Sequence, residues 1–414
     1  MTEFLEVTKM LLRAVPQMLQ RPDYLIIASL VIFLVNYQYK RMAKLEARLF
    51  GAPRNHPGRQ TLYAIFFGLL GGLIGTFVFI FVGISLTDTG IIYIWPLAVL
   101  LMLIHPRFLC FSYAGGLLAL SSLFFGWPGI DIPSVMALVA VLHGVEAILI
   151  RISGHLQPTP VYVKSKEGGV IGGFVLQKFW PLPVIALVYL TLPGAPWPDA
   201  VNMPDWWPLI QSMPEIPPGY EIVYVFFPVV AALGYGDLAI SSHPREKTKR
   251  AASHLLVYSG ILLLLAVLAV RRPLFQYVAP LFAIIGHDLV IQLGQRAEWG
   301  GEPLHVAPSQ GLLVLDILPE KTAHRLGLRT GDLVLAINGQ LPMLGDDGRW
   351  LEAGPVEVLI RREERERILS CPFHPGGPLG IIPAPLPWTR GYVEMKGLEH
   401  QGWLVRQIRK LFRR

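Results

Sequence analysis

The sequence predicts a polytopic α-helical membrane bundle of 7–9 spans followed by one small α+β domain. Two observations carry this prediction. Of the 414 residues, 53% are hydrophobic and only 16% are charged, whereas soluble domains carry roughly 25% charged residues. Long apolar runs fill the chain up to residue 296, and a strand, helix and turn pattern typical of a soluble domain follows. The net charge of +7 then fits the positive bias of cytoplasmic membrane loops, so no nucleic-acid partner is expected.

The apolar runs set the expected spans. The clearest covers 62–86, because about 20 apolar residues cross a bilayer core. Its glycines at 68, 71, 72 and 75 form overlapping G-x-x-x-G pairs, which favour close helix packing. Several other candidates are short or contain Pro and Gly, so nine spans are preferred within the range of seven to nine. These candidates are 24–39, 91–104, 109–125, 135–150, 181–192, 222–240, 252–270 and 274–293.

The charged loops set the expected sidedness. Basic residues dominate 40–60, 151–178 and 241–251, whereas 194–221 has acidic residues and no Lys or Arg. Positively charged loops lie on the cytoplasmic side, and tryptophans gather at the interfaces. Nine spans then place the N-terminus outside and the C-terminal domain in the cytoplasm. The expected interfacial anchors in the acidic loop are Trp197, Trp206 and Trp207.

The two ends of the chain are expected at the membrane surface. Residues 1–23 predict an amphipathic interfacial helix, which leaves 24–296 as the transmembrane domain. Residues 373–414 predict a Pro/Gly-rich tail that ends in a basic amphipathic helix on the anionic leaflet. The alternative is a solvated tail that folds back on the domain. The expected membrane-surface residues are Trp403, Arg406, Arg409, Lys410, Arg413 and Arg414.

The segment 300–372 has the pattern of one recognition domain. An apolar strand over 312–318 meets Pro319, and a short amphipathic helix then ends at Gly327, where a left-handed stop is usual. A Gly-Asp turn leads to a second strand over 333–337, which the Asn338-Gly339 turn closes. This order of pieces resembles the PDZ domain family in its bacterial arrangement, with the domain in the cytoplasm.

The PDZ resemblance implies a peptide-binding groove. In this family an extended peptide adds to a sheet edge while backbone N–H groups hold its carboxylate. The matching edge here is 312–318, and a short helix over 347–353 lies opposite. Because that helix is short, a flat protein-docking surface is the alternative. The expected groove residues are Ser309, Gln310, Gly311, Leu312, Leu313, Val314, Leu315, Trp350 and Leu351.

Three passages of the membrane part, 161–173, 234–250 and 281–288, resemble the MinJ-like family of PDZ-containing cell-division proteins of Firmicutes. The resemblance covers most of residues 20–340. It implies a non-enzymatic, multi-pass membrane adaptor that recruits a DivIVA-like scaffold and the MinC–MinD pair to poles and septum. Two other classes stay open: a transporter-like or sensor protein regulated by its PDZ module, and a component of a membrane protease system.

Polar side chains inside the expected spans are the candidates for chemistry. A membrane zinc protease needs H-E-x-x-H, but the stretch that starts at His287 has neither the Glu nor the second His. We therefore expect no catalytic residue, no metal and no cofactor, and polar groups that hydrogen-bond between helices instead. A metal or proton site is the alternative. The candidates are His143, Glu146, Asp237, His254, His287 and Asp288.

The two cysteines, Cys110 and Cys371, lie in an apolar segment and after a predicted strand of the soluble domain. Two cysteines placed in this way form no disulfide framework. This usage predicts reducing surroundings for the soluble part.

Overall fold

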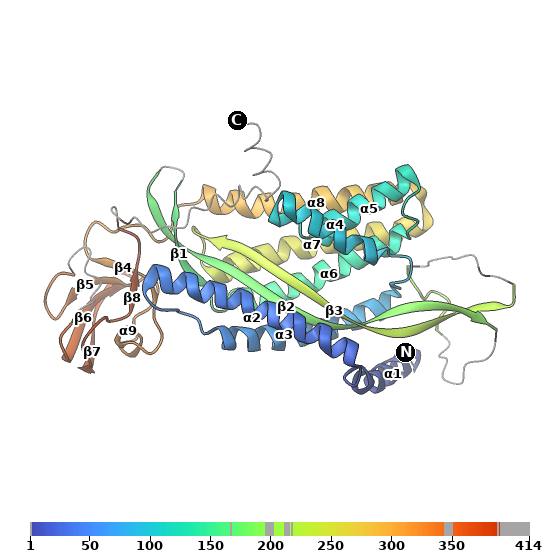
Figure 1. Cartoon of the computed structure of the whole chain (residues 1–414). Coiled ribbons are helices and arrows are strands. Elements are labelled where there is room, and N and C mark those ends of the chain that lie inside the picture. The colour runs from blue at the N-terminus through green and yellow to red at the C-terminus, as the bar shows by residue number, and fades with distance from the viewer. Residues whose placement is uncertain are drawn as a thin grey trace, which may run out of the picture.

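The computed structural model describes residues 2–165, 168–194, 203–210, 216, 218–342, 351–386 and 389. The helices of the membrane part run along one long axis, a long β-hairpin runs with them, and a small sheet lies at one end (Figure 1). The helices are α1 (Thr2–Met18), α2 (Pro22–Phe50), α3 (Pro57–Val82), α4 (Ile91–Ile104), the 3-10 turn η1 (Pro106–Phe108), α5 (Phe111–Phe125), α6 (Ile132–Ser153), α7 (Pro244–Arg271) and α8 (Pro273–Gly300).

Fewer helices than expected are candidates for membrane spans. In the described part of the chain, four helices, α3, α6, α7 and α8, are long and apolar enough to cross a bilayer, and the bent pair α1–α2 makes a fifth if it counts as one span. The helices α4 and α5 have only 14 and 15 residues. The predicted helical spans over 181–192 and 222–240 are wrong, because both segments are β-strands.

Those two segments form the antiparallel hairpin β2 (Val170–Pro193) and β3 (Tyr220–Ala239), paired from Phe174↔Ala239 to Pro193↔Tyr220. The strand β1 (Thr159–Lys164) pairs with the first part of β2. Both long strands are rich in β-branched and aromatic residues, which suit a sheet, and their prolines do not suit a helix interior. An apolar run alone does not distinguish a buried strand from a helix, which explains the error.

Several backbone groups on the edge of β2 that faces α3 have partners or need none. Pro181 and Pro183 have no N–H to satisfy, and Ile185 N donates to Thr76 Oγ1 at 2.9 Å. A strand edge inside an apolar bundle is stable only when such groups find partners. Other backbone groups along β2 form the hydrogen bonds Phe179 N–Tyr39 OH, Leu86 N–Leu187 O and Tyr189 N–Thr87 Oγ1.

The glycines of α3 let this helix approach the strand. A Cβ at Gly68 would lie 2.1 Å from the carbonyl oxygen of Pro181, and one at Gly72 would lie 2.2 Å from that of Pro183. Gly71 instead faces a leucine of the central helix α6. The G-x-x-x-G pairs therefore hold a strand on one side of α3 and a helix on the other, where the sequence predicted helix packing alone.

The amphipathic helix α1 packs on the hairpin end of the bundle. Leu11 is only 2% exposed and belongs to an apolar cluster with Ile185 and Leu187 of β2. Phe4 stacks on Trp206, with ring centroids 5.7 Å apart. Trp207 Nε1 donates to Ile80 O at 2.8 Å, and Trp197 lies outside the described residues.

The C-terminal sheet follows α8. Its elements are β4 (Leu312–Ile317), the short helix α9 (Thr322–Arg325), β5 (Leu333–Ile337), β6 (Gly354–Arg362), β7 (Arg365–His374) and β8 (Ile381–Pro383). The strand order is β7-β6-β5-β4-β8. The sheet has its own apolar core, which includes Val314, Val334 and Val358. It therefore reaches Pro383, beyond the predicted domain boundary at residue 372.

Candidate functional site

The predicted peptide-binding strand β4 lies inside the sheet. It pairs with β5 at Leu312↔Val334 and with β8 at Val314↔Pro383 and Ile317↔Ile381. Because both sides of β4 are paired, a ligand strand adds to β4 only if β8 leaves. In the described part of the sheet, β7 and β8 are the outer strands. The sequence interpretation placed 381–383 in the tail and therefore missed the strand that covers β4.

Three of the nine expected groove residues lie in the core. Leu312, Val314 and Leu315 are at most 3% exposed. Gly311 has a φ of +80°, and a Cβ there would lie 2.5 Å from the carbonyl oxygen of Val334. This turn is therefore in close contact with β5 and requires glycine. Ser309 and Gln310 precede it in an exposed bend, and Leu313 is partly buried.

The predicted helix over 347–353 is only partly within the described residues. Residues 343–350, and with them Trp350, lie outside. Leu351 forms an isolated bridge with Gly377 and is not helical. The tail residues from Trp403 to Arg414 also lie outside the described part of the chain, so the predicted membrane-surface helix stays a prediction.

A tight turn brings β8 back onto β4. Gly380 has a φ of +88°, and a Cβ there would lie 2.3 Å from Lys321 Cβ, so only glycine fits. Leu318 N donates to Gly380 O at 2.8 Å, and Ala384 N donates to Leu313 O at 2.7 Å. The apolar run 379–382 between two prolines is the signal that would have found this strand.

The α2–α3 loop holds β4. Arg54 Nε lies 2.8 Å from Asp316 Oδ2, and the Asp316 side chain is only 4% exposed. Burial raises the pKa of Asp316, and Arg54 acts against this rise. The loop itself is fixed by the buried Glu46, whose carboxylate accepts from Arg54 N at 2.8 Å and from Asn55 N at 2.9 Å.

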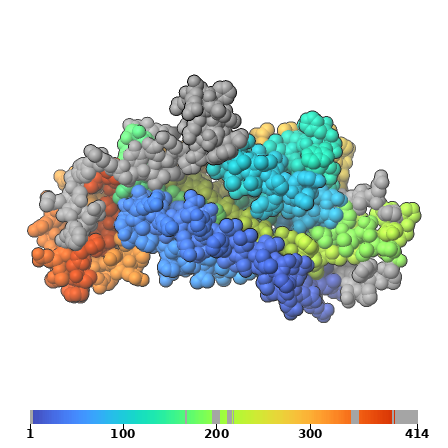
Figure 2. All heavy atoms as spheres, in the orientation of Figure 1, coloured from blue at the N-terminus to red at the C-terminus, as the bar shows by residue number. Residues whose placement is uncertain are grey.

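Further hydrogen bonds hold the sheet against the bundle. Tyr162 OH of β1 donates to Pro383 O of β8 at 2.8 Å, and Gly172 N of β2 donates to His305 O at 2.8 Å. Burial lowers the pKa of His305 to about 4, with a smaller contribution from His243. In Figure 2 the orange and red C-terminal sheet rests against the blue end of the bundle. The sheet thus has a fixed orientation on the membrane part.

The outer surface of the sheet carries exposed apolar side chains. Ile368 and Phe373 of β7 are 67% and 60% exposed, and Leu341, after β5, is 78% exposed. Contiguous exposed apolar surface marks interaction sites, and these three exposed apolar side chains all belong to the C-terminal domain. We call these three residues the outer patch.

The structure separates the polar residues expected inside the spans. His143 and His287 come together, with ring centroids 5.0 Å apart. Asp288 accepts from Tyr113 OH at 3.1 Å, whereas Asp237 pairs with Lys247 at 3.1 Å. Among the described residues, the group around the two histidines includes neither Glu146 nor His254, and its third member is Cys110.

Comparison with known proteins gives one functional lead. Over 208 residues the chain is 24% identical to the cell division topological determinant MinJ of Bacillus subtilis (strain 168). The matched region is 50% of this chain and 49% of that protein, so the chain spans about half the length of this curated relative. No family model matches the chain.

Proposed function

We propose that this protein is a non-enzymatic membrane adaptor that recruits cell-division site-selection proteins to poles and septum through its C-terminal sheet. The sheet is in this proposal a PDZ-like docking domain, and its partners are a DivIVA-like scaffold and a MinD-like inhibitor. The similarity to MinJ supports the role in division. The observation that carries the docking role is that the sheet is held in one orientation on the bundle. The Arg54–Asp316 ion pair and the hydrogen bond from Tyr162 to Pro383 hold it there.

The charge distribution supports a cytoplasmic position of the sheet. The loop that holds β4 lies in the basic stretch 40–60, and the basic stretches around β1 and the start of α7 lie at the same end of the bundle (Figure 1). The ends of β2 and β3 that flank the acidic stretch 194–221 in the sequence point to the opposite end. Positively charged loops stay in the cytoplasm, so the docking domain faces division proteins there.

The outer patch is the proposed docking surface. A peptide that adds to β4, as the family resemblance implies, competes with β8 for the same strand edge. A partner that binds the outer patch needs no such displacement, because Leu341, Ile368 and Phe373 are already exposed. This favours the flat docking surface over the groove, and burial of these side chains supplies about 1.5–3 kcal/mol for each large one.

Localisation in dividing cells tests the proposal. A fluorescent fusion of the full chain is expected at septa and poles. The double variant Ile368→Asp and Phe373→Asp is expected to spread over the whole membrane at unchanged abundance. Val306→Asp is the matched control, because Val306 is 43% exposed and lies outside the outer patch. A uniform distribution of the unmodified protein, or a normal position of the double variant, contradicts the proposal.

A further inference from the structure

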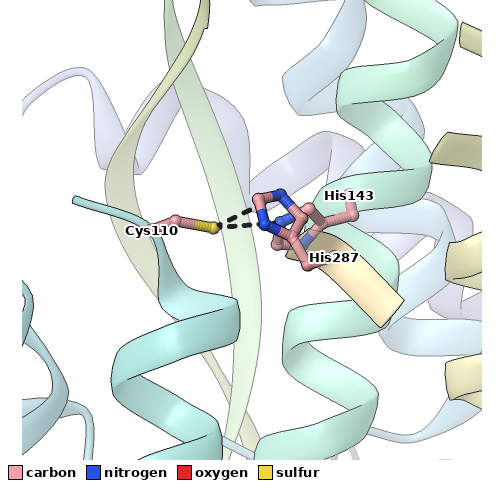
Figure 3. Close-up of side chains that lie close together, drawn as sticks. All are labelled: Cys110, His143 and His287. Atoms are coloured by element: carbon pink, nitrogen blue, oxygen red, sulfur yellow. Dashed lines mark hydrogen bonds between the residues drawn. The ribbon is translucent and has the colours of Figure 1, made fainter. Parts of the chain in front are cut away.

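A sulfur and two imidazoles from separate elements converge inside the bundle. Cys110 Sγ lies 3.2 Å from His143 Nε2 and 3.8 Å from His287 Nε2, and all ligand atoms of the group lie within 4.8 Å of one another. Figure 3 shows both rings directed at the sulfur. His143 lies in the middle of α6, His287 lies in the middle of α8, and Cys110 precedes α5.

The break between α4 and α5 places Cys110 there. The chain leaves α4, makes the turn η1 and starts α5 at Phe111. Cys110 is the extended residue that caps α5, and its sulfur accepts from Ser112 N at 3.4 Å. The N-cap position of α5 thus holds the sulfur beside both imidazoles.

We propose that Cys110, His143 and His287 form a binding site for a transition-metal ion, with Zn²⁺ as the occupant. Thiolate and imidazole are ligands that zinc prefers, whereas magnesium and calcium prefer oxygen. Zn–S and Zn–N bonds in a tetrahedral site hold sulfur and nitrogen ~3.6 Å apart. The two observed Sγ–Nε2 separations, 3.2 and 3.8 Å, lie on either side of this value.

Hydrogen bonding without a metal requires one particular arrangement of protons. A thiol has one proton to donate and its sulfur can accept, so the two Sγ–Nε2 contacts need His143 to accept and an N–H at His287 Nε2 to donate. His143 Nδ1 lies 2.7 Å from Val139 O and, because a carbonyl only accepts, carries the proton. Its Nε2 therefore presents a lone pair to the cluster, which is the state that a metal ligand requires.

A second layer of contacts supports the site. Ser112 Oγ lies 3.4 Å from His143 Nε2 and 2.6 Å from Tyr258 OH, and Tyr258 OH lies 3.0 Å from Ala283 O. A metal ion held here joins the short helix α5 to α6 and α8, and Tyr258 adds α7. The ion's role is thus to fasten the α4–α5 segment to the long helices. This inference is independent of the proposed function.

Metal binding to the purified full chain tests the site. The protein, free of any histidine tag and held in detergent, is titrated with Co²⁺ as a spectroscopic substitute for Zn²⁺. We expect one equivalent of bound metal, with a thiolate-to-cobalt charge-transfer band and tetrahedral visible bands. Cys110→Ser is expected to abolish the charge-transfer band. His143→Gln and His287→Gln are expected to weaken binding by more than about tenfold, the minimum that outer-layer changes typically cost.

Two matched controls change a cysteine and a histidine elsewhere. Cys371→Ser and His254→Gln are expected to leave the bands unchanged. A second measurement avoids any variant that fails to fold: in the Cys371→Ser protein, Zn²⁺ is expected to slow maleimide modification of Cys110 at least tenfold, and a chelator to restore the rate. Absence of both the cobalt band and the zinc protection overturns the proposal and leaves a hydrogen-bonded cluster. A charge-transfer band that persists in Cys110→Ser also overturns it.

Discussion

Buried carboxylates connect the loops and strands of the C-terminal sheet, and each has a specific donor. Asp332 is 1% exposed and receives both the Nε and the Nη2 of Arg362 at 2.6 Å. It also accepts from Arg329 N at 2.8 Å. The Gly-Asp turn before β5 was recognised in the sequence as a turn signal, but the sequence carried no sign of this ion pair, because Arg362 lies 30 residues further on.

The Asp332–Arg362 pair predicts a large stability effect. Arg362→Ala leaves a buried charge without its partner, which costs about 3–5 kcal/mol. The expected result is early unfolding of the C-terminal sheet, measured by limited proteolysis of the full chain against urea concentration. Arg361→Ala is the control, because the Arg361–Glu366 pair is about half exposed and such pairs contribute about 0–1 kcal/mol. Equal effects of both changes would rule out this account.

Buried His305, at the contact between the sheet and the bundle, predicts that the folded protein loses stability in acid. Its pKa is lowered to about 4 by burial, against an ordinary value near 6.5, so the unfolded chain binds the proton first as the pH falls. Stability is then lost between about pH 6.5 and 4, by about 2 kcal/mol at pH 5. The loss in melting temperature from pH 7 to pH 5 should shrink in His305→Gln and stay unchanged in the exposed His324→Gln. An unchanged loss in His305→Gln would show that another group titrates.

At the scale of elements, the long helices could be predicted from the sequence, whereas the β2–β3 hairpin could not. Four predicted helical runs lie largely within the long helices α3, α6, α7 and α8; these runs are 62–86, 135–150, 252–270 and 274–293. They could be predicted because a helix needs no partner segment to satisfy its backbone. A strand needs one, and the partners of β2 lie at residues such as Tyr39 and Thr76. Only the fold brings these together.

The same limit applies to the sites. The strand β8 pairs with β4 about 65 residues away in sequence. Cys110 approaches His143 and His287 only through helix packing, which residue spacing does not reveal. The two histidines were recognised as polar residues in apolar runs, but the sulfur that joins them had no such signal. An isolated cysteine in an apolar segment is usually a small buried hydrophobe.

The contact between α3 and β2 predicts that Gly72 tolerates no side chain. Gly72→Ala places a methyl group 2.2 Å from Pro183 O, so the helix and the strand must separate at a cost of about 1–3 kcal/mol. We expect a lower melting temperature in detergent. Gly260→Ala in α7 is the matched control, because a Cβ there meets nothing within 4 Å and alanine favours the helix by about 1 kcal/mol. If both substitutions shift the melting temperature equally, close packing on β2 is not the reason for glycine.

At the scale of the whole molecule, the hairpin reconciles the charge pattern with the reduced number of helices. In the proposed topology β2 and β3 run between the two ends of the bundle where two helices were expected, so the alternation of basic and acidic loops is kept. Only the number of helical spans falls. The same proposal places the sheet, which Arg54 and Tyr162 hold on the bundle, at the cytoplasmic end.

The central claim is that the outer patch contacts division proteins in the cell, and site-specific photo-crosslinking measures this directly. A photoreactive residue replaces Phe373 in the full chain, and the control position is Val306. After irradiation of dividing cells, mass spectrometry identifies the captured proteins. The account predicts DivIVA-like or MinD-like proteins captured from position 373 and not from position 306. Capture of the same proteins from both positions, or of no division protein from position 373, would contradict it.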